Sequence, residues 1–327
     1  MKKNSVYIIA EIGNNHEGKI SNAKKLIKEA KKSGADAVKF QTFKLENYVR
    51  SDYSSYEKLK KFELTYKEFY ILKKYSDKLK IDFISTPLDL ESAKFLSKIC
   101  NIIKVSSGDN NFYDLIYYLA KKRKKIIIST GLANFLEIKK LINFIIKNFG
   151  NDFLRKKIIL LHCVTSYPVE DNDSNLKSIK YLSDQFKKYN LKIGYSDHTI
   201  GVLASTIAVS LGAKVIEKHF TLKNNFSSFR DHKISLNPND MKQMVFKIRR
   251  TTNLLGSYNK EIGAKEKKLI IHARRTVFAK KKIEKNQIFS EQNLLYLRSS
   301  NKKKTDLRKL YISKIAKRSY KKGEQIE

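Results

Sequence analysis

The sequence predicts a TIM (β/α)8 barrel followed by a small, mostly β domain. Short runs of Ile, Val, Leu and Phe recur eight times over the first ~250 residues, and segments with helical periodicity separate them, which matches such a barrel in number and size. After residue 250 the pattern changes to short alternating runs, which predicts the second domain. A doubly wound open sheet is the structural alternative, but it needs fewer strands, and the sequence has no glycine-rich phosphate turn.

The eight predicted strands are apolar without strict alternation, as expected of parallel strands that are buried on both faces. They span residues 6–13, 37–43, 81–89, 102–109, 125–131, 157–164, 192–197 and 215–222. Helical periodicity is clear at residues 23–32, 92–96 and 138–149. We therefore expect the barrel over residues 1–255.

The tail has a different character. Residues 256–268 have no clear period, and we expect a linker over 256–271. Residues 276–279 and 294–298 alternate and predict strands of a small domain over 272–327. A domain of ~55 residues has little stability alone, so we expect it to pack on another surface.

The net charge of the chain is +36 over 327 residues, from 68 Lys and Arg, of which 57 are lysines. Proteins that read nucleic acids favour Arg and gather it on one face with interleaved aromatic residues, whereas these lysines are spread over nearly every helix. We expect no nucleic-acid partner. So positive a field would still attract anionic substrates.

Composition also indicates the compartment. The sequence has no run of ~18 apolar residues, and its first predicted strand begins within six residues of the N-terminus, so we expect neither a membrane span nor a signal peptide. Two cysteines provide no disulfide framework. These features predict a cytoplasmic protein.

Polar side chains gather at the carboxyl ends of the predicted strands, where TIM barrels build their active sites. They include Lys39, Lys104, several hydroxyl groups, carboxylates and two histidines, His198 and His219. The histidines end consecutive strands, and neutral imidazole is a common ligand of Zn, Mn, Fe and Co. Ser196 and Asp197 could then orient them. The set predicts an anion-binding site with a metal beside it.

Several motifs resemble the bacterial sialic acid synthases, the family of N-acetylneuraminate synthase and its legionaminate and pseudaminate relatives. They lie at residues 9–18, 34–43, 85–87, 161–163, 167–168, 194–199 and 217–221. In the tail, residues 273–275, 297–298 and 322–324 are similar to the C-terminal SAF (antifreeze-like) domain of that family. The resemblance covers essentially the whole chain.

The resemblance implies condensation of phosphoenolpyruvate with N-acetylmannosamine or a related N-acyl amino sugar. The products would be a nine-carbon 2-keto-3-deoxy acid, such as N-acetylneuraminate, and phosphate, formed with C–O cleavage. Within the family, legionaminate and pseudaminate synthases use diacetamido-trideoxy hexoses, and other relatives take a 6-phosphorylated mannosamine; these alternatives stay open.

The resemblance also implies roles for individual residues. The phosphoenolpyruvate site would comprise Lys39, Thr86, Lys104, Ser107, Thr165 and Ser196. The sugar would meet Glu11, Gln41, Tyr167 and Asp231, and Asp109 would lie by the reacting carbons, so that Glu11, Asp109, Tyr167 and Asp231 are the candidate catalytic residues.

The family resemblance further implies a divalent metal, Mn or Mg, on His198 and His219. It implies a domain-swapped homodimer, in which the SAF domain of one subunit covers the barrel mouth of the other and Arg298 reaches the partner's site. Two departures fall at the sugar end: the usual Gly-Pro-Asp appears as Phe229-Arg230-Asp231, and the usual Arg-Pro-Gly as Arg298-Ser299-Ser300.

One other reaction fits the same barrel. A Schiff-base aldolase would use Lys39 or Lys104 as its nucleophile and would need no metal.

Overall fold

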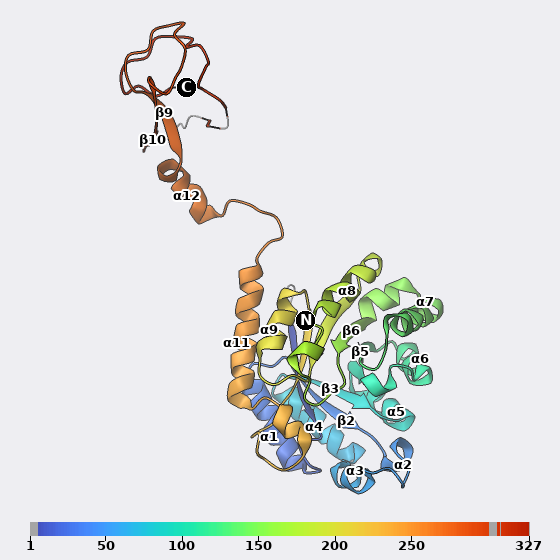
Figure 1. Ribbon diagram of the computed structural model, residues 1–327. Helices are drawn as coiled ribbons and strands as arrows, with labels where there is room; N and C mark the ends of the chain where they lie inside the picture. Colours follow the sequence, from blue (N-terminus) through green and yellow to red (C-terminus); the bar gives the residue numbers. More distant parts are fainter. Residues whose placement is uncertain (1–5, 301–305, 308, 327) are drawn as a thin grey trace. The chain divides into compact units, whose positions relative to one another are not determined.

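The computed structural model describes residues 6–300, 306–307 and 309–326. Eight parallel strands close into a barrel in chain order, as predicted (Figure 1). They are β1 Tyr7–Gly13, β2 Ala37–Thr42, β3 Asp82–Pro87, β4 Ile102–Val105, β5 Lys125–Ser129, β6 Ile158–Cys163, β7 Lys192–Asp197 and β8 Val215–His219.

Helices surround this barrel (Figure 1). They are α1 Ile20–Lys32, α2 Leu45–Tyr48, α3 Tyr56–Phe62, α4 Tyr66–Lys78, α5 Leu90–Ile99, α6 Tyr113–Lys121, α7 Phe135–Lys157, α8 Lys177–Gln185, α9 Leu203–Ser210, α10 Arg230–Ile234 and α11 Pro238–Leu255. Three 3-10 turns, η1 Ser107–Asp109, η2 Asp171–Asp173 and η3 Lys187–Tyr189, lie between them. The buried apolar faces of all of these helices but α2, α3 and α10 form one core with the outer faces of the strands. None of the helices in the described ranges is long and apolar enough to cross a membrane.

Side-chain alternation along the strands separates the barrel interior from the helix-facing core. The lower interior is filled by an apolar layer. One step of two residues further along, the same inward faces carry polar groups: Ile9 is followed by Glu11, Ala37 by Lys39, and Val215 by Glu217. The register places Glu11 beside Lys39 on one side and beside His219 on the other. The layer consists of Tyr7, Ile9, Ala37, Ile84, Ile127, Ile159, Leu161 and Val215.

Some strands are shorter than predicted. The strand expected over 102–109 ends at Val105, because Ser107–Asp109 turn into η1 and the Ser106 hydroxyl donates to Asp109 Oδ2 at 2.5 Å. The strand expected over 215–222 ends at His219, after which Phe220 forms only an isolated bridge with Leu236. Polar turn residues thus start the loops of the barrel mouth earlier than apolar content suggests.

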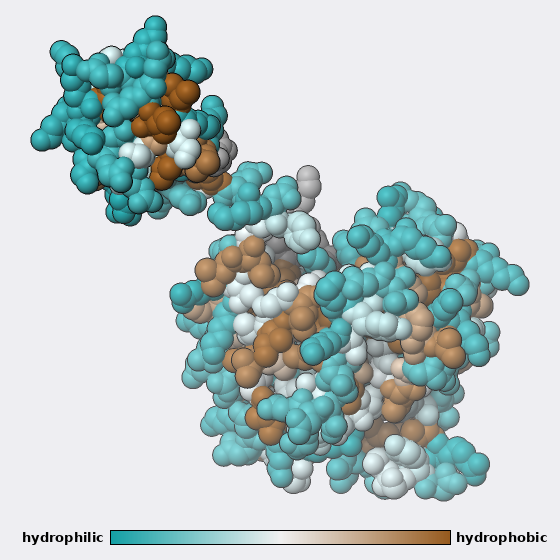
Figure 2. All heavy atoms as spheres, turned by 45° about the horizontal axis from the view of Figure 1, so that its top comes forward, coloured by the Kyte–Doolittle hydropathy of each residue, from teal (hydrophilic) through white to brown (hydrophobic). Residues whose placement is uncertain are grey.

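The chain divides into two compact units, Met1–Gly256 and Ser257–Glu327. In the second unit, β9 Arg275–Ala279 and β10 Leu294–Arg298 pair antiparallel, which confirms the two alternating runs as strands. The unit has its own small core. On the face that Figure 2 shows, hydrophilic residues are spread over each unit rather than collected on one side.

The segment expected to be an aperiodic linker contains a helix, α12 Ala264–Ala273. No residue of α12 is buried, so packing within the unit does not explain it. Its sequence, AKEKKLIIHA, is rich in strong helix formers, and these favour a helix without an amphipathic pattern. The expectation was wrong because it relied on periodicity alone.

Candidate active site

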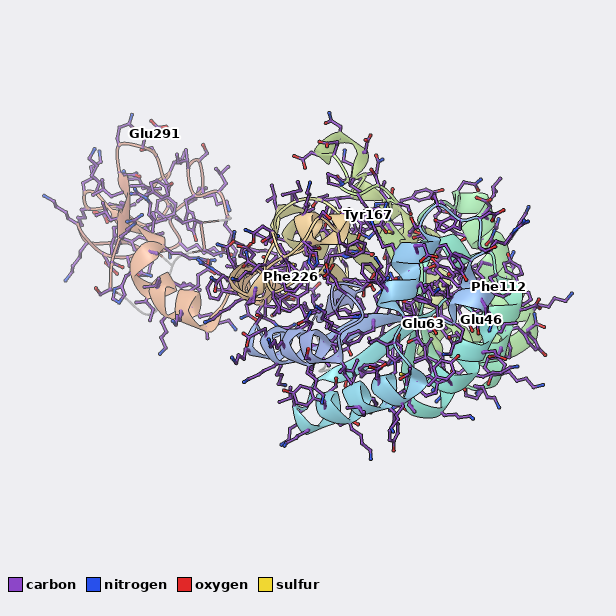
Figure 3. The ribbon with its side chains drawn as sticks, turned by 90° about the horizontal axis from the view of Figure 1, so that it is seen from below. Glu46, Glu63, Phe112, Tyr167, Phe226 and Glu291 are labelled. Carbon is purple, nitrogen blue, oxygen red and sulfur yellow. The ribbon has the colours of Figure 1, made fainter. Side chains whose placement is uncertain are left out.

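A cavity of about 500 Å³ opens at the carboxyl ends of the barrel strands. Each of the eight strands contributes at least one lining side chain. Twelve predicted site residues line it: Glu11, Lys39, Gln41, Thr86, Lys104, Ser107, Thr165, Tyr167, Ser196, His198, His219 and Asp231. Tyr167, labelled in Figure 3, comes from the loop between β6 and α8.

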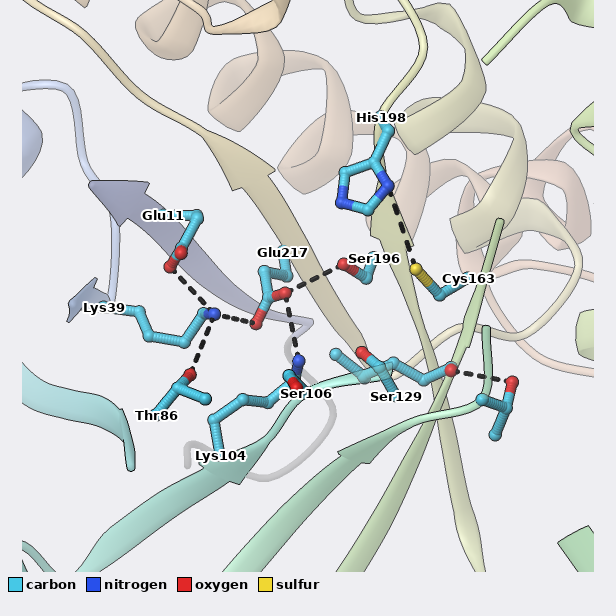
Figure 4. Close-up of polar contacts among 12 residues, drawn as sticks. Glu11, Lys39, Thr86, Lys104, Ser106, Ser129, Cys163, Ser196, His198 and Glu217 are labelled. Atoms are coloured by element: carbon cyan, nitrogen blue, oxygen red, sulfur yellow. Dashed lines mark hydrogen bonds and ion pairs between the residues drawn. The ribbon is translucent and has the colours of Figure 1, made fainter. Parts of the chain in front are cut away.

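A buried charge network forms the floor of this cavity (Figure 4). Glu217 lies between two lysines, with Oε2 3.6 Å from Lys39 Nζ and Oε1 3.4 Å from Lys104 Nζ. Lys39 also contacts Glu11 Oε2 at 2.9 Å and donates to Thr86 Oγ1 at 3.3 Å. All three charged side chains around Glu217 are almost completely buried. Buried charges of this kind persist because each has a partner.

The network sets different protonation preferences for its two carboxylates. Burial raises the pKa of Glu11 to about 7, although Lys39 opposes the shift. Burial acts in the same direction on Glu217, but Lys104, Lys39 and the Ser196 hydroxyl together lower its pKa to about 2. Glu217 is therefore the permanent anion, and Glu11 is the group that can exchange a proton near neutrality.

The two lysines also differ. Burial disfavours the charge of Lys39, but Glu11 and Glu217 hold its pKa above the ordinary value. Burial lowers the pKa of Lys104. Its ion-pair partner is Glu217, which it shares with Lys39, and the charge of Lys39 repels it. Lys104 is therefore the cation most in need of an additional anionic partner.

Hydroxyl groups close one side of the cavity around Gly131. A methyl group on Gly131 would lie 2.3 Å from Thr165 Oγ1 and 2.6 Å from Ser107 Oγ. The two hydroxyls can approach this closely only because the residue between them has no Cβ. Two strands further round the barrel, on β7, Ser196 Oγ donates to Glu217 Oε1 at 2.8 Å.

The two histidines meet in the cavity with their ring centroids 5.4 Å apart. His198 Nδ1 lies 2.8 Å from the Val164 carbonyl oxygen, so that nitrogen carries the proton and Nε2 has a free lone pair. His219 Nδ1 is buried without a hydrogen-bond partner in the described structure. Burial, followed by the charge of His198, lowers the pKa of His219 far below its usual value. Burial opposes the shift, but the Cys163 thiol and the Val164 carbonyl raise the pKa of His198 above its ordinary value. When His198 is neutral, its Nε2 lone pair and the His219 imidazole lie in one polar cavity and fit a divalent metal.

Ser196 and Asp197 do not orient these histidines, contrary to expectation. Ser196 bonds to Glu217, and Asp197 points to the helix-facing side of the barrel, where it pairs with Lys218 at 3.1 Å. The alternation of β7 explains the difference, because Asp197 lies on the face opposite to Ser196. In the described part of the chain, no group of three or more His, Cys, Asp and Glu side chains is arranged as a metal site. Water or substrate would have to complete the coordination of a metal on the two histidines.

Aromatic and basic side chains line the outer cavity. The Tyr167 ring lies 4.2 Å from the His198 ring, centroid to centroid. The guanidinium carbon of Arg230 lies 5.0 Å from the centroid of the same Tyr167 ring. Arg230 Nε also lies 3.4 Å from Asp231 Oδ1. Phe229 packs edge-on against Phe62 at 5.0 Å. The residues that depart from the family pattern, Phe229 and Arg230, thus face this part of the cavity.

Two predicted site residues do not line the cavity. Asp109 lies behind it on η1, half-buried and bonded to Ser106, and burial raises its pKa. Arg298 is the last residue of β10 and belongs to the second unit. The structure does not bring Asp109 into the network around Glu217.

The carboxylates expected at the strand ends include Glu217, but the sequence assigned it no role. Its position was accessible from strand alternation, because Glu217 and His219 share one face of β8 and Lys218 has the other. Asn14, whose amide donates to Gln41 Oε1 at 2.9 Å, was missed in the same way. It lies on the loop after β1, within the family motif at residues 9–18, which assigned it no role.

A closed parallel barrel with a polar cavity at the carboxyl ends of its strands is the architecture of TIM-barrel enzymes. The chain belongs to the NeuB family, whose model matches residues 26–260. It is an enzyme of the sialic acid synthase type.

Two curated relatives and one solved structure show the range of similarity. N,N'-diacetyllegionaminic acid synthase of Campylobacter jejuni is 42% identical over 100% of this chain and 99% of its own. N-acetylneuraminate-9-phosphate synthase of Drosophila melanogaster is 36% identical over 75% of this chain and 67% of its own. The N-acetylneuraminic acid synthetase of Leptospira borgpetersenii, solved with citrate, has a TM-score of 0.75 and 34% identity, covering 81% of this chain and 90% of that one.

Proposed function

We propose that the chain condenses phosphoenolpyruvate with an N-acyl amino sugar and water, and releases a nonulosonic acid and phosphate. The observation that supports this most directly is the pair of buried lysines around Glu217, surrounded by hydroxyl groups. Phosphoenolpyruvate brings a carboxylate and a phosphate, and a compact cluster of Lys and Ser/Thr donors suits both.

The anion would occupy the space between Lys104 and the hydroxyls of Ser107 and Thr165. Glu217 neutralises the lysines before the substrate enters, which keeps two buried cations together without a ligand. The substrate then supplies the additional negative charge that Lys104 lacks. Lys39 and Thr86 would hold its other end.

In the proposed reaction, carbon 3 of phosphoenolpyruvate attacks the aldehyde carbon of the sugar and forms the new C–C bond. The aldehyde oxygen takes the electrons of its π bond and a proton, and becomes a hydroxyl group. Positive charge develops at carbon 2, and water adds there and loses a proton. Loss of the second proton of that water forms the ketone as the C–O bond to phosphate breaks. Glu11 is placed to orient this water and take its proton, because its pKa of about 7 lies near working pH. Tyr167 and Asp231 would hold the sugar.

His198 and His219 would hold a divalent metal, Mn or Mg, which when bound would supply Lewis acidity at the aldehyde oxygen. The chain's own contribution is to orient the rings. The Val164 carbonyl fixes the tautomer of His198, and Tyr167 supports its ring.

For the acceptor, the resemblance alone puts N-acetylmannosamine first, but two observations favour a 2,4-diacetamido-trideoxy hexose. The C. jejuni legionaminic acid synthase matches over the full length of both chains at 42% identity. The outer cavity presents the Phe62–Phe229 pair, an apolar surface that suits a methyl group at sugar carbon 6. Its cations are engaged: Lys58 lies over the Phe229 ring, and Arg230 pairs with Asp231.

Steady-state kinetics with one sugar at a time tests this choice. We expect kcat/KM to be highest for the diacetamido-trideoxy hexose, ahead of N-acetylmannosamine and of its 6-phosphate. A preference of tenfold or more for N-acetylmannosamine would restore it as the acceptor, since that is the discrimination a pocket achieves with one small group.

We also propose that the second unit is a SAF domain that covers the active site of the partner subunit, with Arg298 reaching the sugar. The similarity of its motifs to the family supports this, as does the small core of the unit, in which eight of the described apolar residues are buried. A Schiff-base aldolase is disfavoured by membership of the NeuB family and, at Lys39, by Glu11 and Glu217, which keep that lysine protonated. Lys104, whose pKa burial lowers, is the lysine that such an enzyme would use. Borohydride trapping with substrate would reveal such an enzyme by a mass increase on Lys39 or Lys104.

A further inference from the structure

A second cavity, of about 460 Å³, lies at the other end of the barrel. It opens where β3, β4 and β5 begin and where α7 leads into β6, so the strands separate it from the active site. Six cationic side chains line it: Lys73, Lys122, Arg123, Lys124, Lys125 and Lys157. None of them takes part in the chemistry proposed above.

The two carboxylates of this cavity are already engaged. Asp77 Oδ2 accepts from Lys73 Nζ at 2.5 Å within α4. Asp82 Oδ2 accepts from the Tyr7 hydroxyl at 2.5 Å. Asp82 keeps its negative charge and partly offsets that of Lys125, but among the described residues neither carboxylate forms an ion pair with residues 122–125 or with Lys157.

Lys124, Lys125 and Lys157 are half-buried, and within the described residues they form no ion pair. Elsewhere on the barrel, exposed lysines do find partners, as Lys180 does with Asp184 at 2.9 Å. Burial, then the charges of Lys192 and Lys157, lower the pKa of Lys125. The lysines here repel one another on a concave surface, where low-dielectric walls concentrate positive potential.

Aromatic rings position two further cations at the same place. Arg123 lies 5.2 Å from the centroid of the Phe153 ring, and Lys122 lies 5.8 Å from that of Tyr118. Arg123 has φ of 57°, a left-handed conformation that turns the chain sharply between α6 and β5. The turn brings residues 122–125 together on the cavity wall.

We infer that this cavity is a binding site for a small polyanion with at least two phosphate groups. Its volume is that of a small-molecule site, and its cations line one concave space rather than a track for a nucleic acid. Two phosphates would give Lys124, Lys125 and Lys157 the partners they lack.

Calorimetric titration with inorganic pyrophosphate, in chelator and at fixed ionic strength, tests the site. We expect one pyrophosphate per chain to remain bound in Lys104→Met, where the active-site anion subsite is lost. We expect the double substitution Lys125→Gln/Lys157→Gln to weaken that binding at least tenfold, and each single substitution about threefold, through lost charge. A matched control, Lys187→Gln/Lys188→Gln, removes two exposed lysines from η3 and should leave binding unchanged.

Three results would overturn the inference: no binding to the full chain, loss of all binding in Lys104→Met, or equal weakening in the control. Thermal unfolding of each variant shows whether it is folded. If the double variant is unfolded, the two single variants test the inference instead. Because the assay needs neither sugar nor turnover, its result is independent of the proposed condensation.

Discussion

Glu217 determines how two lysines can remain charged inside the barrel mouth. It lies within 3.6 Å of both ammonium groups and accepts from Ser196, so its charge persists at any working pH. Lys39 has a second carboxylate in Glu11, whereas Lys104 has none. The anion-binding strength of the site should therefore depend most on Lys104.

Lys104→Met should reduce kcat/KM for phosphoenolpyruvate by about 10²–10³-fold, the usual cost of removing one preorganised charge from a buried site. The exposed Lys121→Met, on α6, is the matched control and should behave like the parent chain. Initial-rate kinetics measures both. A loss of less than threefold in Lys104→Met would exclude Lys104 from the substrate site.

Gly131→Ala tests the contact between the two hydroxyls. The added methyl group would displace Thr165 Oγ1 and Ser107 Oγ, so KM for phosphoenolpyruvate should rise about tenfold or more, with little change in folding. Gly263→Ala serves as control, because a Cβ there meets nothing within 4 Å. Equal KM values for the two variants would contradict the placement of the phosphate.

His16 predicts a pH dependence of stability. Burial lowers its pKa from 6.5 to about 4, and its Nδ1 accepts from the Gly18 amide. The unfolded chain thus binds more protons between these values, and stability falls as pH decreases below 6.5. Between pH 8 and pH 5 the loss from this group is about 2 kcal/mol. Urea unfolding of the parent and of His16→Gln should differ by this amount in pH dependence; identical curves would show that His16 titrates normally.

At the scale of elements, the sequence-based analysis was strongest where burial repeats. The eight strands and their order were predicted, because an apolar run flanked by helical periodicity is visible in each unit of a barrel. The rim residues followed, since the carboxyl ends of parallel strands converge. The alternation of side chains was not used to decide which polar residues point into the barrel. Glu217, which points inward, was therefore given no role, and Asp197, which points outward, was expected to orient the metal ligands. Strand ends and α12 were missed because turn chemistry and intrinsic propensity decide them.

Asp197 and Lys218 tie β7 to β8 on the helix-facing side. Their side chains are fully buried, and Asp197 also accepts from the Thr199 amide and the Ser205 hydroxyl. Lys218→Met should cost about 3–5 kcal/mol of unfolding free energy, because it strands a buried carboxylate. The double variant with Lys218→Met and Asp197→Asn should lose less unfolding free energy than the sum of the losses in the two single variants. Chemical denaturation of all four proteins measures the coupling, and simple additivity would show that the pair does not interact.

At the scale of the molecule, the two units pose the question of how an active site is completed. If the second unit closes the partner's barrel, two inactive chains should restore each other: Arg298→Ala keeps an intact barrel, and Lys104→Met keeps an intact lid. Random exchange in a dimer gives one working site in half of the molecules, hence about a quarter of parental activity. Initial rates after mixing measure this. No recovery despite exchange would place Arg298 in its own subunit's site or outside it.

The measurement that tests the central claim most directly uses phosphoenolpyruvate labelled with ¹⁸O at the oxygen that bridges carbon 2 and phosphorus. Mass spectrometry of the phosphate released in the presence of Mn and the acceptor sugar reports which bond breaks. Water addition at carbon 2 predicts sugar-dependent release of phosphate that retains the label. Unlabelled phosphate, or no sugar-dependent release from folded, metal-loaded protein, would contradict the condensation proposed for this barrel.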